Sequence, residues 1–262
     1  MYKVTILGSG AAPGVPAIAY GWGNCNPDNP KNVRTRTSVY VEYNQTKILI
    51  DTSPDLRMQM LSNAITELDA VLYTHPHADH LHGIDDLREI NRLHHCSLNF
   101  YATGDTMRVI RQRFQYLLAT PDHLNNVVTH PSMIANEVNY YQPFEVNNLK
   151  VMPIRLIGHV VPSTGYIFND GEMVYISDYR RIEEKAFEFI KKPVKLMIVP
   201  LTTPEGSEFH ASLDEVLRDI AKINPRQAII NHMAAECDYD VIRNITPQNV
   251  EPAYDNMKVE FE

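Results

Sequence analysis

The segment "AVLYTHPHADHLHGIDDLREIN", residues 70–91, joins an apolar strand pattern to a dense group of histidines and aspartates. Imidazole and carboxylate groups are ligands for zinc, and they also suit manganese or iron. On a tight loop after a strand, two alternate residues such as His75 and His77 can face one cation. Two adjacent residues that follow them, such as Asp79 and His80, can face a neighbouring cation. The segment therefore predicts a metal site that begins two metal positions, with donors from "HPHADH": His75, His77, Asp79 and His80.

His82 falls outside this spacing. It is either a group that supports the ligands from behind or an ordinary surface residue.

The composition is that of an ordinary globular protein. Of the 262 residues, 44% are hydrophobic and 21% are charged. No apolar run approaches the roughly 18 residues that a membrane span requires. The start lacks a secretion signal and the three cysteines are widely spaced, so we expect a cytoplasmic protein with reduced thiols. The net charge of -8 argues against broad nucleic-acid binding, whereas a small anionic ligand remains compatible with it.

Short strand patterns alternate with helical patterns along the chain, which predicts α/β or mixed α+β layers within a single domain, residues 1–262. The oligomeric state is left open, a homodimer included. Residues 120–146 are the least patterned and form either a lid over a site or an ordinary surface excursion. Ser212 and Glu215 predict a capping box. Strand patterns cover 3–7, 38–43, 47–53, 70–75, 98–103, 149–156, 164–169, 173–178, 195–200 and 227–232, and helical patterns cover 54–64, 104–118, 181–191 and 212–223.

Three predicted strands end in a potential ligand: His75, Asp178 and His232. A further histidine, His159, follows another strand. Taken alone, His159 would more often be a hydrogen-bonded core residue, and Asp178 would cap a helix. The complete set in one chain favours metal binding instead.

The "HxHxDH" spacing, followed in order by "LIGHVVPSTGYIF", "VYISDYR" and "AIINHMA", resembles the metallo-β-lactamase superfamily. The resemblance implies a four-layer αββα sandwich with the metals at the edge between its two sheets. It also implies a cofactor of two divalent ions, Zn or Mn. The ligand set carried over from it is His75, His77 and His159 for one metal, Asp79, His80 and His232 for the other, and Asp178 between them.

The surrounding sequence resembles the phosphoribosyl cyclic phosphate phosphodiesterase branch of this superfamily. The stretches that carry the resemblance are "LGSGAAPGVP", "RTRTS", "ILIDTSPDLRMQML", "HADHLHGIDDLREIN" and "EFHASLDEVL". It implies hydrolysis of a small nucleotide-like or cyclic phosphodiester by a metal-bridging hydroxide. Asp79 and His210 would be catalytic, and a near-neutral imidazole such as His210 can protonate a leaving alkoxide.

Arginines are the expected phosphate contacts, because guanidinium forks match phosphate oxygens. The candidates are Arg57, Arg88 and Arg180, although Arg88 could equally pair with Asp85 or Asp86. The glycine turn at residues 7–10 either cradles a phosphate or simply links a strand to the next segment.

One departure from this branch concerns a separate structural zinc, held there by a cysteine cluster and a histidine. Here Cys25 stands alone and Ala235 occupies the histidine position. A closed zinc site needs four ligands, so we expect none in this chain. The loop 14–30 is then expected to be ordered by packing of Tyr20 and Trp22.

Other functions remain open from the sequence. A metallohydrolase of another class, either a thioesterase or a lactonase, would use the same ligands. A tRNA 3′-processing nuclease is less compatible with the acidic net charge. A non-enzymatic nucleotide-binding protein would have no need of an open two-metal centre.

Overall fold

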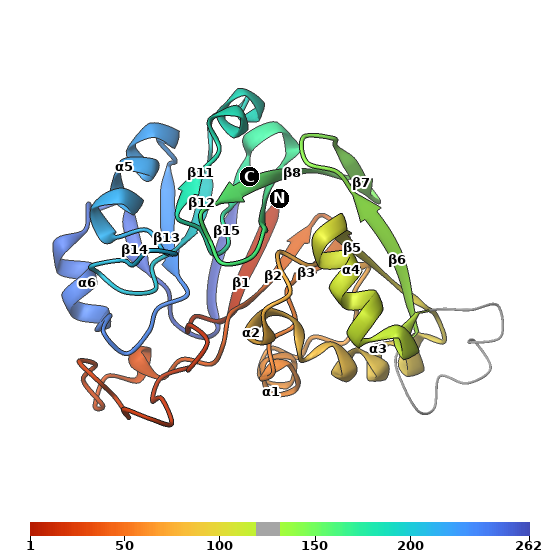
Figure 1. Ribbon diagram of the computed structural model, residues 1–262, viewed down its shortest axis with the longest axis horizontal. Coiled ribbons are helices and arrows are strands. Elements are labelled where there is room, and N and C mark those ends of the chain that lie inside the picture. Colours follow the sequence, from red (N-terminus) through yellow and green to blue (C-terminus); the bar gives the residue numbers. More distant parts are fainter. Residues whose placement is uncertain (119–131) are drawn as a thin grey trace.

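A computed structural model describes residues 1–118 and 132–262 and shows two sheets packed face to face (Figure 1). In the described residues the first sheet has the order β15 (Met257–Phe261), β1 (Tyr2–Gly8), β2 (Ser38–Tyr43), β3 (Thr46–Ile50), β4 (Ala70–Leu72), β5 (Leu98–Thr103) and β6 (Met133–Val138). The second has the order β11 (Arg181–Ile182), β8 (Leu149–Ile157), β9 (Ser163–Phe168), β10 (Met173–Tyr175), β12 (Leu196–Pro200), β13 (Gln227–Asn231) and β14 (Val250–Pro252), and β7 (Phe144–Val146) pairs with β8.

Parallel pairing decides where the strand ends lie. Strands β3, β4, β5 and β6 are parallel neighbours, and so are β10, β12, β13 and β14. The carboxyl ends of parallel strands meet at the same edge of a sheet. The segments that follow β4, β10 and β13, which carry His75, Asp178 and His232, therefore gather at such edges.

Alternating side chains make the core between the sheets. Val39 and Val41 on β2 are fully buried in the cluster shared by both sheets, whereas Tyr40 between them belongs to a second cluster on the outer face. The same period of two places Ile48 and Ile50 inward. Burying each such aliphatic side chain contributes about 1.5–3 kcal/mol, so this alternation fixes which face of the strand is inside.

Helices cover both outer faces. On the first sheet, α1 (Leu56–Ser62), α2 (Ala78–Leu81), α3 (Arg88–His94) and α4 (Gly104–Arg113) supply apolar side chains to the outer cluster. On the other side lie α5 (Leu213–Ile223) and α6 (Tyr239–Ile245) (Figure 1). The predicted four-layer αββα sandwich is confirmed. In the part of the chain that the structure describes, no helix is long and apolar enough to cross a membrane.

The predicted capping box is confirmed, since Glu215 Oε2 accepts a hydrogen bond from Ser212 N at 2.9 Å. The helix predicted over 181–191 is wrong. Arg181 and Ile182 pair with β8 as β11, and the 3₁₀ helix η6 (Glu184–Phe189) follows. Pairing with the sheet outweighs the helical pattern there.

The stretch 120–146, considered as a lid, divides into two parts. Residues 133–146 contain β6, which pairs with β5, and β7, which pairs with β8. This part therefore extends the two sheets. Residues 119–131 lie outside the described residues. The lid prediction for that part of the stretch stays a prediction.

The loop 14–30 is ordered partly as predicted. Trp22 packs against an apolar cluster, whereas Tyr20 is 64% exposed, so the prediction for Tyr20 is wrong. The buried Arg34 guanidinium adds a hydrogen bond to the loop, because its Nη1 donates to Cys25 Sγ at 3.7 Å. The apolar cluster consists of Val15, Cys25 and Ala235.

Candidate metal centre

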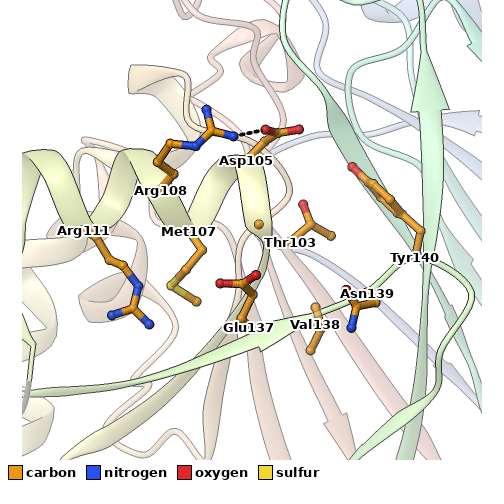
Figure 2. A pocket seen from close by; sticks show the side chains of 10 residues that line it. Thr103, Asp105, Met107, Arg108, Arg111, Glu137, Val138, Asn139 and Tyr140 are labelled. Atoms are coloured by element: carbon orange, nitrogen blue, oxygen red, sulfur yellow. Dashed lines mark hydrogen bonds and ion pairs between the residues drawn. The ribbon is translucent and has the colours of Figure 1, made fainter.

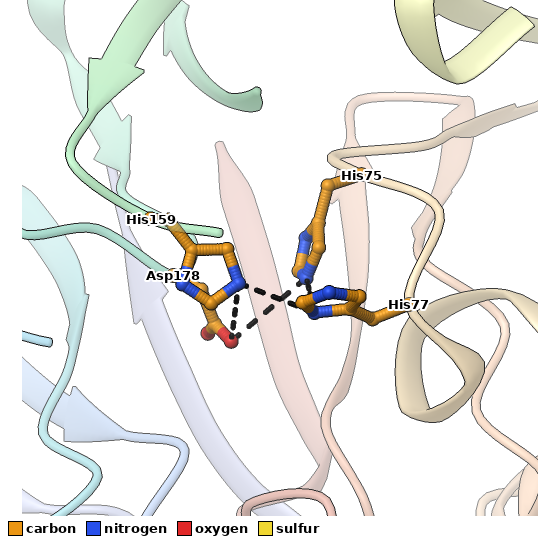
Figure 3. A group of neighbouring side chains, drawn as sticks. All are labelled: His75, His77, His159 and Asp178. Carbon is orange, nitrogen blue, oxygen red and sulfur yellow. Dashed lines mark hydrogen bonds and ion pairs between the residues drawn. The ribbon is translucent and has the colours of Figure 1, made fainter. Parts of the chain in front are cut away.

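Three imidazoles converge where the sheets meet (Figure 3). His75 and His77 follow β4, and His159 lies just beyond β8. His77 Nδ1 is 3.1 Å from His75 Nε2 and 3.2 Å from His159 Nε2. We call these three residues the histidine group.

A second group consists of Asp79, His80 and His232 and is called the mixed group. His80 Nε2 and His232 Nε2 are 3.4 Å apart, and each is 3.3 Å from Asp79 Oδ2. Asp79 and His80 lie on the short helix α2, while His232 directly follows β13 with a positive φ of 56°. The turn at His232 thus brings the second sheet into contact with a helix of the first.

Asp178 lies between the two groups. Its Oδ2 is 3.8 Å from His75 Nε2 and 3.7 Å from His80 Nε2, while its Oδ1 is 3.4 Å from His232 Nε2. Oδ1 is buried and accepts no hydrogen bond from the described residues. A buried carboxylate oxygen without a donor is costly unless a cation satisfies it.

These distances fit divalent cations. Zinc binds histidine nitrogen and carboxylate oxygen at about 2.0–2.2 Å, which sets tetrahedral ligand atoms about 3.3–3.5 Å apart. The mixed group matches this spacing along every edge given above, and the histidine group is only slightly tighter. The cluster therefore fits divalent metal binding, and every ligand predicted from the sequence takes part in it.

Burial and charge set the protonation of the ligands. Burial, aided by the neighbouring His80, lowers the pKa of His75 well below its usual value, and burial lowers the pKa of His159 to about 4. Burial alone would raise the pKa of Asp178, but His232 and His80 outweigh it and hold this pKa well below its usual range. Neutral imidazoles and an ionised carboxylate are the forms that bind metals.

Asp51 supports the mixed group from behind and was not among the sequence candidates. It is fully buried after β3, and its Oδ2 lies 2.7 Å from His80 Nδ1. Thr74 donates to Asp51 through both its backbone N–H and its hydroxyl, at 2.8 and 2.7 Å. This contact leaves His80 Nε2 to face the metal position. The available signal was a strand that ends in aspartate, "ILID".

His210 reaches the same space from the segment between β12 and α5. Its Nε2 is 3.8 Å from Asp178 Oδ2, and its ring centroid is 5.0 Å from that of His159. Ser207 Oγ lies 3.2 Å from His210 Nδ1 and steadies the ring. The structure thus places His210 beside the predicted ligands. His82 lies elsewhere, with its ring against Phe114.

The three candidate arginines contact other groups. Arg180 Nη1 is 2.5 Å from Glu215 Oε2, and Arg88 Nε is 3.4 Å from Glu89 Oε1. Arg57 lines a groove between α1 and α3 that contains none of the predicted metal ligands. Their contact with phosphate stays a prediction.

The glycine turn at residues 7–10 is packed against protein. A Cβ atom at Gly8 would lie 2.1 Å from Arg36 O, and one at Gly10 would lie 2.9 Å from Thr35 O. These glycines let two backbone segments approach closely, which favours the linking turn over the phosphate cradle.

The fold and the donor groups together define a class. Residues 46–233, well over half of the chain, match the family model described as the β-lactamase superfamily domain. The chain therefore belongs to the β-lactamase superfamily and has the metallo-β-lactamase fold.

Similar proteins narrow the class. A crystal structure of a new diphosphatase from the PhnP family is 28% identical with a TM-score of 0.88, and the match covers 100% of this chain and 98% of that one. The resemblance to this branch is thus confirmed. Zinc-bound PqqB from Methylobacterium extorquens is 19% identical, with a TM-score of 0.77 and coverage of 99% and 100%. Human short-form tRNase Z is 18% identical, with a TM-score of 0.68 and coverage of 98% of both chains. These last two show the fold alone.

A curated relative is the octanoyltransferase of Porphyromonas gingivalis, which is 32% identical over 258 residues. The match covers 98% of this chain and 51% of the relative. The chain thus spans about half the length of this relative, and the match does not assign octanoyl transfer to the matched half.

Proposed function

We propose that the protein is a phosphodiesterase that uses two divalent cations, Zn or Mn, to cleave a small nucleotide-like or cyclic phosphodiester. The observation that carries the phosphodiester assignment is the likeness to the PhnP-family diphosphatase over the whole of both chains. The net charge of -8 favours a small substrate over a nucleic acid, which basic residues would have to clamp.

In this proposal the histidine group holds one cation and the mixed group holds the other. Asp178 contributes to both, because its Oδ2 lies near His75 as well as His80 and its Oδ1 lies near His232. Bound cations at such a site lower the pKa of water and neutralise charge on the oxygens around phosphorus. The chain's own part is to hold the imidazoles of His75 and His159 neutral and the carboxylate of Asp178 ionised.

His210 is the proposed proton donor. When the bond from phosphorus to the leaving oxygen breaks and an oxygen from water takes its place, the leaving oxygen needs a proton. His210 Nε2 faces the centre beside Asp178 without occupying a ligand position. A histidine loses and regains a proton near neutral pH, so it suits this role.

The test compares hydrolysis of bis(p-nitrophenyl) phosphate with hydrolysis of a thioester and a lactone by the metal-loaded protein. We expect metal-dependent turnover of the phosphodiester. With a nucleoside 2′,3′-cyclic phosphate, whose leaving alkoxide needs a proton, His210→Gln should lower kcat about 10²–10⁴-fold with little change in metal content. With bis(p-nitrophenyl) phosphate the loss should be much smaller, because p-nitrophenolate leaves without a proton. Turnover of the thioester or lactone without that of the phosphodiester would contradict the proposal.

A second candidate is an acyl-group hydrolase, a thioesterase or lactonase. The name of the Porphyromonas gingivalis relative favours it, because octanoyl transfer is acyl chemistry. An octanoyl thioester in the same assay series tests this candidate directly.

A further inference from the structure

A cavity lies next to the first turns of α4 and contains none of the predicted metal ligands (Figure 2). It occupies about 520 Å³ at the carboxyl ends of β5 and β6, under the first turns of α4. That volume suits a group the size of a nucleobase. Its lining includes Thr103, Gly104, Arg108, Arg111, Glu137 and Tyr140.

The cavity is within reach of a substrate held at the metals. Strands β4, β5 and β6 are parallel neighbours, and adjacent strands lie about 4.8 Å apart, so the ends of β4 and β6 are separated by roughly 10 Å. A ribose joins a phosphate to a base over such a span.

Hydrogen bonds also connect the two places. Thr103 Oγ1 is 3.2 Å from Thr164 Oγ1, and Thr164 N donates to Thr74 O at 3.0 Å. Thr74 Oγ1 in turn lies 3.0 Å from His75 Nδ1.

The charges in the cavity are unevenly paired. Arg108 forms an ion pair with Asp105. In the described chain, neither Arg111 nor Glu137 has an ion-pair partner. Glu137 Oε1 would lie only 3.2 Å from a Cβ atom at Gly104, so the missing side chain there gives the carboxylate its room. The cavity thus offers a cationic donor and an anionic acceptor that are both uncommitted.

Tyr140 supplies an aromatic face. Its hydroxyl accepts a hydrogen bond from Thr164 Oγ1 at 3.4 Å, which restrains the ring. Figure 2 shows Tyr140 across the cavity from the α4 side chains, with Glu137 between them. A flat ligand can therefore stack on Tyr140 while its edge meets charged groups.

We propose that this cavity binds the guanine base of a nucleoside phosphodiester. Guanine has acceptors at O6 and N7, which match the donors of Arg111, and an N2 amino donor, which matches the carboxylate of Glu137. Stacking of the base on the Tyr140 ring would add to this binding whatever the identity of the base. This inference rests on the proposed function, because it names the substrate class of the same centre.

The test is calorimetric titration of guanosine into the metal-free protein, with adenosine and inosine as comparisons. Guanosine carries no phosphate, so its binding reports on the cavity alone. We expect guanosine to bind more tightly than inosine, which lacks the N2 amino group, and adenosine to bind least. Glu137→Gln and Arg111→Met should each weaken guanosine binding about tenfold or more, since a good pair of hydrogen bonds to a base contributes about 1–3 kcal/mol. Arg92→Met, whose partner Glu89 lies on the surface of α3, is the matched control and should leave binding unchanged.

Guanosine binding that is absent, that equals adenosine binding, or that survives both cavity variants would overturn the inference. The same protein, loaded with metal, is assayed with bis(p-nitrophenyl) phosphate, which has no base. Absence of that turnover would contradict the proposed function. Turnover without guanosine binding would overturn the cavity assignment alone.

Discussion

The histidine group and the mixed group face the same carboxylate but differ in charge and support. The histidine group has three imidazoles and no carboxylate except the shared Asp178. The mixed group has Asp79 of its own, and Asp51 lies behind His80. Negative charge and a supported ligand both strengthen cation binding. The comparison therefore predicts that the mixed group holds its cation more tightly.

The shared carboxylate gives the largest predicted effect. Asp178→Ala removes an acidic group that faces both positions. We expect kcat for bis(p-nitrophenyl) phosphate to fall at least about 10³-fold, since both cations lose a common ligand. Metal content, measured by elemental analysis, should fall from two ions per chain to one or none.

The matched control is Asp170→Asn, which removes the charge of a surface carboxylate paired with Lys150 and keeps a residue that tolerates the positive φ of 64° there. It should leave both quantities unchanged. Two ions per chain in Asp178→Ala would refute the bridging assignment, and normal turnover would remove its catalytic role.

Asp51→Asn tests the support of the mixed group. Asn tolerates the positive φ of 61° at this position, so the backbone should be kept while the charge behind His80 is lost. We expect cation affinity of the mixed group to fall about 10–100-fold, with the histidine group little changed. Competition with a metal chelator measures both affinities.

Thr202→Val is the control for that variant, because Thr202 makes only a 3.3 Å contact to His232 Nδ1. Its effect should be smaller. An equal loss of cation affinity in both variants would contradict this account. The Asp51 carboxylate would then support the mixed group no more than the Thr202 hydroxyl does.

The position of His159 in the histidine group depends on a close approach between two chain segments rather than on a supporting carboxylate. Gly158 precedes His159 with φ of 84°, and a Cβ atom there would lie 2.5 Å from Arg180 Cβ. Gly158→Ala should lower the free energy of unfolding by about 1–3 kcal/mol and weaken the histidine group selectively. Gly21→Ala is matched, because φ is 59° and nothing lies within 4 Å of the added atom. Equal losses of unfolding free energy in the two variants, measured by denaturant unfolding, would contradict this account of residue 158.

The smallest predicted effect concerns Glu215, which holds Arg180 behind that loop. The hydrogen bond from Arg180, followed by that from Ser212 N, lowers the pKa of Glu215 to about 2. A carboxyl with a lowered pKa contributes stability above its unfolded pKa of about 4.3, and this contribution is lost as the pH falls toward 2. Solvent screening limits it to about 1 kcal/mol.

Glu215→Gln should therefore be less stable than the parent at pH 7, and the difference should shrink toward pH 2 in denaturant unfolding. Glu208→Gln, an exposed carboxylate in the preceding loop, should show no such trend. A difference that does not change with pH would argue against the ion pair.

The layers and the side chains that meet in the two donor groups could be predicted from the sequence, because both depend on local patterns. Strand ends that carry His75, Asp178 and His232 can be recognised one segment at a time, and the family resemblance then orders them. The pairing of strands that are distant in the chain is harder to recognise from the sequence. Residues 181–191 carry a helical pattern, but the start of this segment pairs with β8 instead. Strand β6 lies inside the stretch 120–146, whose sequence pattern was the least regular.

Supporting residues were harder to predict than ligands. Asp51 and His80 are far apart in sequence, and only the parallel pairing of β3 with β4 brings their segments together. The phosphate contact of the candidate arginines stays a prediction. A guanidinium suits phosphate in principle, but Arg180 is paired with Glu215 in the structure. A residue type alone does not show where its side chain goes.

The central claim is that one phosphodiesterase centre needs two cations, one in each group. The most direct measurement is the rate of bis(p-nitrophenyl) phosphate hydrolysis while Zn or Mn is added stepwise to the metal-free protein. The account predicts little turnover with the first equivalent, which fills the mixed group, and a rise to a plateau with the second. A plateau at one equivalent, or saturation with both cations and no phosphodiester turnover, would contradict it.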